Sequence, residues 1–188
     1  MIVRPRDNPN IVWKKFKPPV FVHPHNQGSA VGASLVKKKG DLKASLAFSH
    51  RYSKITLVDE YIKGTEVTCA ILGNEKLQAL PLVEIVPKKD FFDFEAKYNP
   101  KLVNEIVPAR ISKSLTKKAQ DAALVAYQTL GCCGFGRVDM IIKDGQVYVL
   151  EVNTIPGLTP VSLFPKAAAA AGISYPKLLD KIIEFSTP

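Results

Sequence analysis

Two short segments of the chain, 138–142 and 147–152, consist largely of β-branched and apolar residues, a composition that is typical of β-strands. Between them stands the pair Asp144-Gly145, and such a pair tolerates the positive φ angles that a two-residue turn requires. The two segments are therefore predicted to form an antiparallel β-hairpin.

Other segments show the apolar spacing of amphipathic helices, and they lie at 41–52, 114–130, 165–171 and 175–185. The first helix is expected to begin with Asp41 as its cap. Its expected buried positions are Leu42, Leu46 and Ser49. The second helix is expected to be capped by Ser112 or Ser114 and to end at Gly131. Its expected inward positions are Leu115, Ala119, Ala122, Ala123, Ala126 and Tyr127.

Further strands are predicted at four places, namely 20–22, 55–62, 67–72 and 77–86. The first of them is expected to stop at His23-Pro24, and the last two to form a second hairpin around Gly73-Asn74. Residues 91–108 have no regular period and several aromatic side chains, which predicts a long lid rather than a disordered stretch. The pattern as a whole predicts an α+β protein.

Polar side chains gather where the strands of the first hairpin lie side by side. By the alternation of strand faces, Arg137 shares a face with Asp139, and Glu151 shares a face with Asn153. The start of one antiparallel strand lies beside the end of the other, so these four side chains are expected to converge. Two carboxylates and an amide oxygen suit Mg²⁺, and an arginine can stabilise charge that develops on a phosphoryl group or an oxyanion. Spacing alone also allows an ordinary hairpin with a surface ion pair.

The composition narrows the class of protein. The chain has 188 residues, of which 46% are hydrophobic and 23% charged, as in an ordinary globular protein. No apolar run approaches the roughly 20 residues that span a bilayer, and no signal-peptide pattern is present, so no membrane partner is predicted.

The three cysteines have neither disulfide nor zinc spacing, which predicts reduced thiols in a cytoplasmic protein. The net charge of +9 comes from scattered lysines without a nucleic-acid-binding motif, so no nucleic-acid partner is predicted.

Three motifs, RVDM, LEVNT and PGLTPVS, follow one another between Arg137 and Ser162. Together they resemble the metal-binding end of the ATP-grasp ligases, and most closely the D-alanine–D-alanine ligases. The resemblance implies that Mg²⁺ or Mn²⁺ is bound by three oxygen ligands, Asp139, Glu151 and Asn153. It also implies that Arg137 and the backbone of Gly157 hold a tetrahedral intermediate, and that Ser162 and Leu163 hold the carboxylate of the second D-alanine.

The resemblance extends to positions that bind ATP. Residues 26–32, NQGSAVG, resemble the flexible loop that covers the phosphates, in which Ser29 would bond near the first D-alanine. Residues 57–62, LVDEYI, resemble the hinge strand of the adenine pocket, and residues 91–98, FFDFEAKY, resemble the omega loop that closes over substrate. Tyr98 in this loop implies use of D-alanine rather than D-lactate. The further residues that the resemblance places at the nucleotide are Asp59, Glu60, Ile62, Glu66 and Lys97.

At His23 the sequence departs from the family, which normally has a lysine that contacts the nucleotide phosphates. A lysine carries a permanent charge at neutral pH, whereas an ordinary histidine, with a pKa near 6.5, is mostly neutral there. His23 could still donate one hydrogen bond to a phosphate, or it could be a loop residue without a role.

The resemblance implies ATP-dependent ligation of two D-alanines through an acyl phosphate, for the synthesis of peptidoglycan precursors. Residues 1–64 would then be part of the central lobe, and residues 65–188 the C-terminal lobe, with the nucleotide between the two lobes. Family members normally carry a full N-terminal domain before this part, so the predicted partners are ATP, D-alanine and either a second copy or a complementing N-terminal domain. The alternative is a truncated or degenerate nucleotide-binding module without ligase activity.

Overall fold

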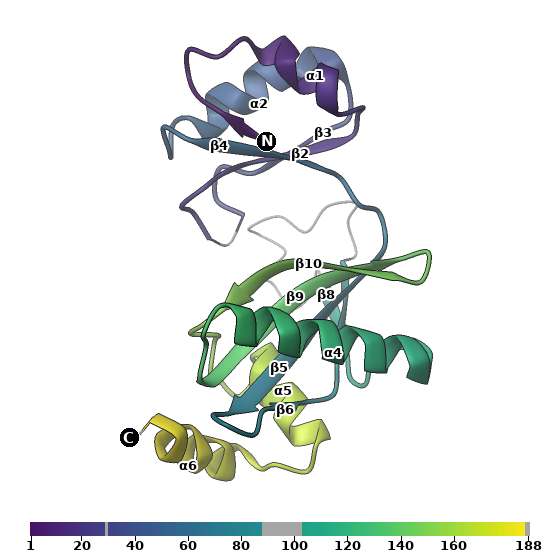
Figure 1. The fold of residues 1–188 in the computed structure, drawn as a ribbon, viewed down its shortest axis with the longest axis vertical. Coiled ribbons are helices and arrows are strands. Elements are labelled where there is room, and N and C mark those ends of the chain that lie inside the picture. Colours follow the sequence, from purple (N-terminus) through teal and green to yellow (C-terminus); the bar gives the residue numbers. More distant parts are fainter. Residues whose placement is uncertain (29, 88–102, 187–188) are drawn as a thin grey trace. The chain divides into compact units, whose positions relative to one another are not determined.

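The computed structural model describes residues 1–28, 30–87 and 103–186, which form two compact units (Figure 1). Unit 1 comprises Met1–Ile62 and Pro87–Val103, and unit 2 comprises Lys63–Val86 and Asn104–Pro188. Each unit combines antiparallel strands with helices, which agrees with the predicted α+β class. None of the described helices is long and apolar enough to cross a membrane.

Unit 1 is built on an antiparallel sheet with the strand order β1-β4-β2-β3. Its strands are β1 (Ile2–Val3), β2 (Val20–Pro24), β3 (Ser34–Val36) and β4 (Thr56–Glu60). Its helical segments are η1 (Pro9–Ile11), α1 (Val12–Lys15), η2 (Lys39–Asp41) and α2 (Leu42–Ser49). One face of the sheet is buried against these segments, because Val20, Val22 and Val58 form one core cluster with Val12 and Leu42.

Strand β2 is longer than predicted, and this places His23 inside a strand instead of after one. His23 pairs with Leu57 of β4, and Pro24 pairs with Thr56. The pairing with β3 ends earlier, at Val22, so Pro24 lies beyond the part of β2 that has neighbours on both sides. A proline without an N–H can occupy such a position, and the predicted stop at His23-Pro24 is therefore wrong.

Helix α2 buries Leu42, Leu46 and Ser49, which confirms the predicted buried side. The predicted cap is wrong, because Asp41 has a helical backbone conformation and its side chain makes no capping hydrogen bond. The helix also ends at Ser49, earlier than the apolar pattern indicates. Asp41 belongs to the tight turn η2 that leads into α2, so the side chain is not placed to accept from the first helical N–H groups.

Unit 2 is built on a larger antiparallel sheet with the order β10-β9-β5-β7-β8, in which β6 also pairs with β5. Its strands are β5 (Thr65–Gly73), β6 (Gln78–Ala79), β7 (Val83–Pro87), β8 (Val103–Ile106), β9 (Gly134–Lys143) and β10 (Gln146–Asn153). Helix α4 (Lys113–Thr129) packs on one face of the sheet (Figure 1). Helices α5 (Leu163–Ala170) and α6 (Tyr175–Ser186) pack on the other face.

The strand predicted at 77–86 is broken into β6 and β7, so that prediction is wrong. Leu72 pairs with Gln78 in the first part and Thr68 pairs with Val83 in the second, and the register differs between the two. Pro81 lies between the two parts, and a proline cannot donate a hydrogen bond to the neighbouring strand. The Gly73-Asn74 turn that joins β5 to this region is confirmed, with Gly73 at a positive φ of 115°.

The predicted irregular stretch 91–108 falls largely outside the described residues. Within the described part, Val103–Ile106 forms strand β8 at the edge of the sheet beside β7, so the prediction is wrong for these residues. Val103 is buried. A strand of four residues whose partner lies far away in sequence leaves little periodic signal of its own, because its pairing is decided by tertiary contacts.

Helix α4 agrees closely with its prediction. The Ser112 side chain accepts a hydrogen bond from the Leu115 N–H at 3.2 Å, so Ser112 is the cap. Ala119, Ala123 and Tyr127 are fully buried, whereas the predicted inward residues Leu115, Ala122 and Ala126 are only partly buried. Gly131 follows the helix with a φ of 66°, which is the left-handed conformation expected of a residue that ends a helix.

Candidate functional site

The hairpin of β9 and β10 brings the predicted polar side chains together. Its turn has the predicted residues, with φ angles of 50° at Asp144 and 72° at Gly145. Pairing then places Glu151 opposite Asp139 and Asn153 opposite Arg137. Paired residues of neighbouring strands point to the same face, so the four side chains share one face of the sheet.

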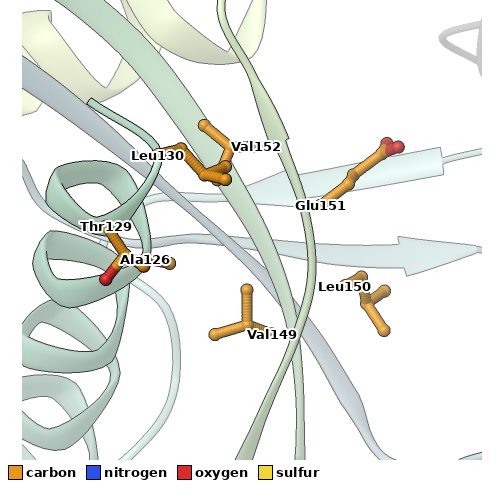
Figure 2. Close-up of a pocket in the computed structure, with 7 residues that line it drawn as sticks. All are labelled: Ala126, Thr129, Leu130, Val149, Leu150, Glu151 and Val152. Carbon is orange, nitrogen blue, oxygen red and sulfur yellow. The ribbon is translucent and has the colours of Figure 1, made fainter. Parts of the chain in front are cut away.

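A β-bulge in β10 decides this arrangement. Val149 pairs with Met140 but Glu151 pairs with Asp139, and Leu150 is the extra residue between them. With regular pairing, Leu150 would lie opposite Asp139, and Glu151 would point to the face that carries helix α4. Figure 2 shows the Glu151 side chain extending away from α4. The bulge therefore transfers Glu151 and Asn153 to the face of Asp139.

The Asp139 carboxylate is the centre of the hydrogen-bond network at this site. Arg137 binds it with two donors, Nε to Oδ1 and Nη2 to Oδ2, both at 2.8 Å. Thr68 donates from its hydroxyl to Oδ1 at 2.6 Å, and the Asn153 amide nitrogen donates to Oδ2 at 3.0 Å. Both carboxylate oxygens are thus held from two sides. The Asn153 amide directs its nitrogen at Asp139, so its oxygen points elsewhere.

Arg137 is a permanent cation in this setting. Its side chain is 19% exposed and that of Asp139 is 14% exposed, so the pair is largely withdrawn from water. Burial alone would lower the pKa of Arg137, but the hydrogen bonds to Asp139 and the charges of Asp139, Glu151 and Glu66 raise it above its ordinary value. A guanidinium has five N–H donors, and the bidentate contact uses two of them. The remaining donors can serve a ligand.

Glu66 belongs to the same face of the sheet. It pairs with Ile141 of β9, and Thr68, two residues further along β5, pairs with Asp139. By strand alternation Glu66 points to the side of Asp139, and its charge contributes to the raised pKa of Arg137. The structure thus places three acidic residues on one face near one arginine.

A loop before helix α5 holds the next group of predicted residues. Ser162 precedes the first residue of the helix, Leu163, and its Oγ lies 2.8 Å from the Thr159 hydroxyl oxygen. A Cβ built on Gly157 would lie 3.0 Å from Ser162 Oγ, so Gly157 and Ser162 are neighbours and a side chain at Gly157 would crowd the serine. The structure therefore brings Gly157 and Ser162 together in one loop.

In unit 1, His23 lies beside Asp59. The His23 Nε2 atom lies 3.0 Å from Asp59 Oδ2, and Nδ1 lies 3.2 Å from the carbonyl oxygen of Pro24. Both partners are hydrogen-bond acceptors, so both contacts are made at once only by a protonated ring. The hydrogen bond from His23 lowers the pKa of Asp59, although burial acts in the opposite direction. His23 therefore contacts Asp59, which was itself predicted to lie at the nucleotide.

The other residues that were predicted to bind the nucleotide do not all share one face of the sheet. Asp59 pairs with Phe21 and Glu60 pairs with Val20, so these two acidic residues point to opposite faces of the sheet. Ile62 lies after the end of β4 and is the last residue of this segment of unit 1. Three of the predicted residues, namely Ser29, Lys97 and Tyr98, lie outside the described residues.

An apolar groove of about 300 Å³ lies beside the bulge, between β10 and the end of α4 (Figure 2). The residues that line it come from the end of α4 and from β10, namely Ala126, Thr129, Leu130, Val149, Leu150, Glu151 and Val152. Leu130 and Leu150 are more than half exposed. The groove lies next to the bulge and shares Glu151 with the Asp139 cluster, and sequence reasoning did not predict it.

Sequence reasoning also missed Thr68. The signal was available, because Thr68 stands in the strand predicted at 67–72 and two residues after Glu66, so the two share a face if the strand begins at Glu66. Within the described parts of the chain, no cluster of three or more His, Cys, Asp or Glu side chains could by itself hold a metal ion. The predicted ligand set differs from such a cluster, because its third member is an amide.

The chain is similar to known ligases along almost its whole length. The family model described as the D-ala D-ala ligase C-terminus matches residues 4–184. A D-alanine–D-alanine ligase of Syntrophobacter fumaroxidans is 47% identical over 170 residues, which are 89% of this chain and 55% of that protein. The chain thus spans about half the length of the curated relatives that it matches.

Comparison with solved structures leads to the same family of ligases. A VanG D-Ala:D-Ser ligase from Enterococcus faecalis superposes with a TM-score of 0.86 at 33% identity, covering 99% of this chain and 55% of that one. A D-alanine–D-alanine ligase from Bacillus anthracis in complex with ATP gives a TM-score of 0.82 at 37% identity, covering 99% of this chain and 59% of that one. The chain belongs to the D-Ala–D-Ala ligase C-terminal family and has the ATP-grasp fold of its structural neighbours.

Proposed function

We propose that this chain forms the catalytic part of an ATP-dependent ligase that joins two D-alanines to D-alanyl-D-alanine for peptidoglycan precursors. The observation that carries the proposal is the cluster of Arg137, Asp139, Glu151 and Asn153, which stands in register at one end of the β9–β10 hairpin. Family membership supports the proposed reaction class, because the relatives and one ATP-bound neighbour are named as ligases. The free cysteines of the chain fit a cytoplasmic setting, where the proposed substrates occur.

The donor set at this cluster fits Mg²⁺ or Mn²⁺. Asp139 and Glu151 supply carboxylate oxygens from paired positions, and the amide of Asn153 directs its nitrogen at Asp139, which leaves its oxygen for a ligand. Hard oxygen donors in small number are what Mg²⁺ takes from proteins, with water and phosphate oxygens completing its coordination. When bound, the metal would neutralise charge on the phosphates of ATP.

The chain's own residues suit the two steps of the reaction. In the first step a D-alanine carboxylate oxygen attacks the γ-phosphorus of ATP, and ADP leaves with the electrons of the broken P–O bond. In the second step the amine of the other D-alanine attacks the acyl phosphate, and inorganic phosphate leaves as the amine loses a proton. Arg137 stays charged throughout and can bind the oxyanions of both steps.

The second D-alanine is proposed to bind at the loop before α5. Gly157 offers its backbone without a side chain, and the adjacent Ser162 hydroxyl and the start of helix α5 at Leu163 suit a carboxylate. ATP is proposed to contact His23, Asp59, Glu60, Ile62, Glu66 and Lys97, and the first D-alanine to lie near Ser29 and Tyr98. A second copy of the chain or a complementing N-terminal domain is the proposed protein partner.

The proposal predicts that D-alanine stimulates ADP release from ATP and Mg²⁺, whereas L-alanine does not. The measurement is a coupled assay of ADP, made on the chain alone and with the remaining domain of the Syntrophobacter relative added in trans. Stereospecific stimulation in either condition supports the ligase. Nucleotide binding without stimulation in both conditions would instead support a nucleotide-binding module that lacks ligase activity.

His23→Lys is predicted to tighten ATP binding at pH 8 by about tenfold. A lysine ammonium carries its charge at this pH, and a charge-assisted bond to a phosphate is worth about 1.5–3 kcal/mol. An uncharged imidazole can offer a phosphate only one neutral hydrogen bond, so the lysine should gain affinity over the parent. Isothermal titration calorimetry with ATP at pH 8 measures the effect.

His25→Lys is the matched control for this experiment. His25 Nδ1 lies 2.8 Å from the Ser53 hydroxyl, a contact within unit 1 that involves no residue proposed at the nucleotide. This variant should keep the parent's affinity for ATP. Equal ATP affinity of the parent and His23→Lys at pH 8 would assign His23 to the structural pair with Asp59 alone.

A further inference from the structure

Thr68 is a buried residue that serves the candidate site from the neighbouring strand. It is 1% exposed, stands in the middle of β5 and pairs with Asp139 of β9. Its hydroxyl oxygen lies 2.6 Å from Asp139 Oδ1 and 3.2 Å from the Val138 carbonyl oxygen. The single hydroxyl proton therefore has its closer acceptor in the Asp139 carboxylate.

The strand itself does not require a hydroxyl at this position. A valine has the same branched shape as threonine and suits a buried strand position at least as well. Among the residues that the structure describes, removing the hydroxyl would leave Asp139 Oδ1 with the Arg137 Nε donor alone, at 2.8 Å. The hydroxyl of Thr68 is thus explained by the hydrogen bond that it donates to the Asp139 carboxylate.

The orientation of the Asp139 carboxylate matters because each of its two oxygens accepts hydrogen bonds from two different residues. Oδ1 accepts from Thr68 and Arg137, and Oδ2 accepts from Arg137 and Asn153. Thr68 is the one of these partners that is buried in the strand interior and was assigned no contact with substrate or metal. It can therefore hold the carboxylate in place while Arg137 and Asn153 use their remaining polar groups for a ligand.

We propose that Thr68 is a positioning residue, whose hydroxyl fixes the plane of the Asp139 carboxylate and thereby aims both Asp139 and Arg137. The consequence for metal binding rests on the proposed function, whereas the orientation of Arg137 does not. Mutation of a residue that hydrogen-bonds to a metal-binding carboxylate typically lowers metal affinity by about 10- to 100-fold. Thr68 acts through Asp139 and is itself no ligand.

The test compares Thr68→Val and Thr68→Ala, which lack the hydroxyl, with Thr68→Ser, which keeps it. Thr56→Val is the matched control, because Thr56 is also fully buried in a strand and its hydroxyl bonds to Ser49 and His50 in unit 1. The first readout is the NMR signal of the Arg137 Nε–H group without any ligand. The second is Mn²⁺ affinity, measured by electron paramagnetic resonance with a non-hydrolysable ATP analogue.

Loss of the hydroxyl is expected to shift the Arg137 Nε–H signal and to weaken Mn²⁺ binding by about 10- to 100-fold, whereas Thr68→Ser and Thr56→Val stay close to the parent. Thr68→Ala cannot crowd its neighbours, so it carries the test if Thr68→Val does not fold. An unchanged Arg137 signal in the folded variants overturns the inference. Absence of Mn²⁺ binding by the parent would contradict the proposed metal site, and the Arg137 signal would then decide the role of Thr68.

Discussion

Asp139→Asn, Glu151→Gln and Asn153→Ala should each reduce Mg²⁺-dependent ATP binding and turnover by 100-fold or more, on the order of 3 kcal/mol. Each change removes one hard oxygen donor or its charge from the proposed ligand set, which is small, and Mg²⁺ tolerates little deviation from octahedral geometry. Asp139→Asn should have the largest effect, because it also removes the charge that faces Arg137 across two hydrogen bonds. Calorimetric titration with ATP, with and without Mg²⁺, measures the loss.

The matched control is Asp121→Asn, the same chemical change on the exposed surface of α4, where Asp121 pairs with Lys117. Exposed pairs of this kind contribute little, so this variant should bind Mg²⁺ and ATP as the parent does. Circular dichroism shows whether each variant keeps the fold. Unchanged affinity for Mg²⁺-ATP in all three site variants would mean that the hairpin carries an ordinary ion pair and no metal.

Tyr127→Ala should lower the free energy of unfolding of unit 2 by about 3–5 kcal/mol. The Tyr127 side chain is fully buried in the core between α4 and the sheet, and its hydroxyl donates to the Cys133 carbonyl at 2.8 Å. Burial, together with Cys132 and Cys133, raises the pKa of Tyr127 to about 12, so the hydroxyl keeps its proton and remains a donor at neutral pH. Urea denaturation followed by circular dichroism measures the change.

Tyr127→Phe separates the ring from the hydroxyl. This variant keeps the packed ring and loses one hydrogen bond, so it should destabilise unit 2 by only about 1 kcal/mol. Equal losses for Tyr127→Phe and Tyr127→Ala would show that the ring contributes no packing energy, contrary to its position in the core.

Gly136 gives an independent check of the same contact. A Cβ at Gly136 would lie 2.5 Å from Tyr127 Cε2 and 3.2 Å from the Asn153 backbone oxygen. Gly136→Ala should therefore destabilise the parent by about 1–3 kcal/mol and should destabilise the Tyr127→Ala variant less. The close approach of α4 to β9 at Gly136 thus supports the end of the β9–β10 hairpin where Arg137 and Asn153 pair.

Local sequence determined the elements whose signals lie within a few residues of one another. The Asp144-Gly145 turn has the positive φ angles that its residues favour. Helix α4 begins at Ser112, one of the two predicted caps, and ends before Gly131 as predicted. The motif residues Gly157 and Ser162 are neighbours because only a short loop separates them. Turn and cap preferences depend on one or two side chains and the adjacent backbone, so they can be read without the rest of the fold.

Tertiary structure decided the features that depend on partners distant in sequence. Alternation showed that Glu151 shares a face with Asn153, but only the bulge at Leu150 placed that face on the side of Asp139. Register is a property of two strands together, and one extra residue reverses the direction of every side chain after it. For the same reason the sequence could not show that Thr68 meets Asp139 or that His23 meets Asp59, since each contact joins strands that pair across the sheet. The sequence by itself thus supplied the residues and the turns of the candidate site, and strand register assembled them.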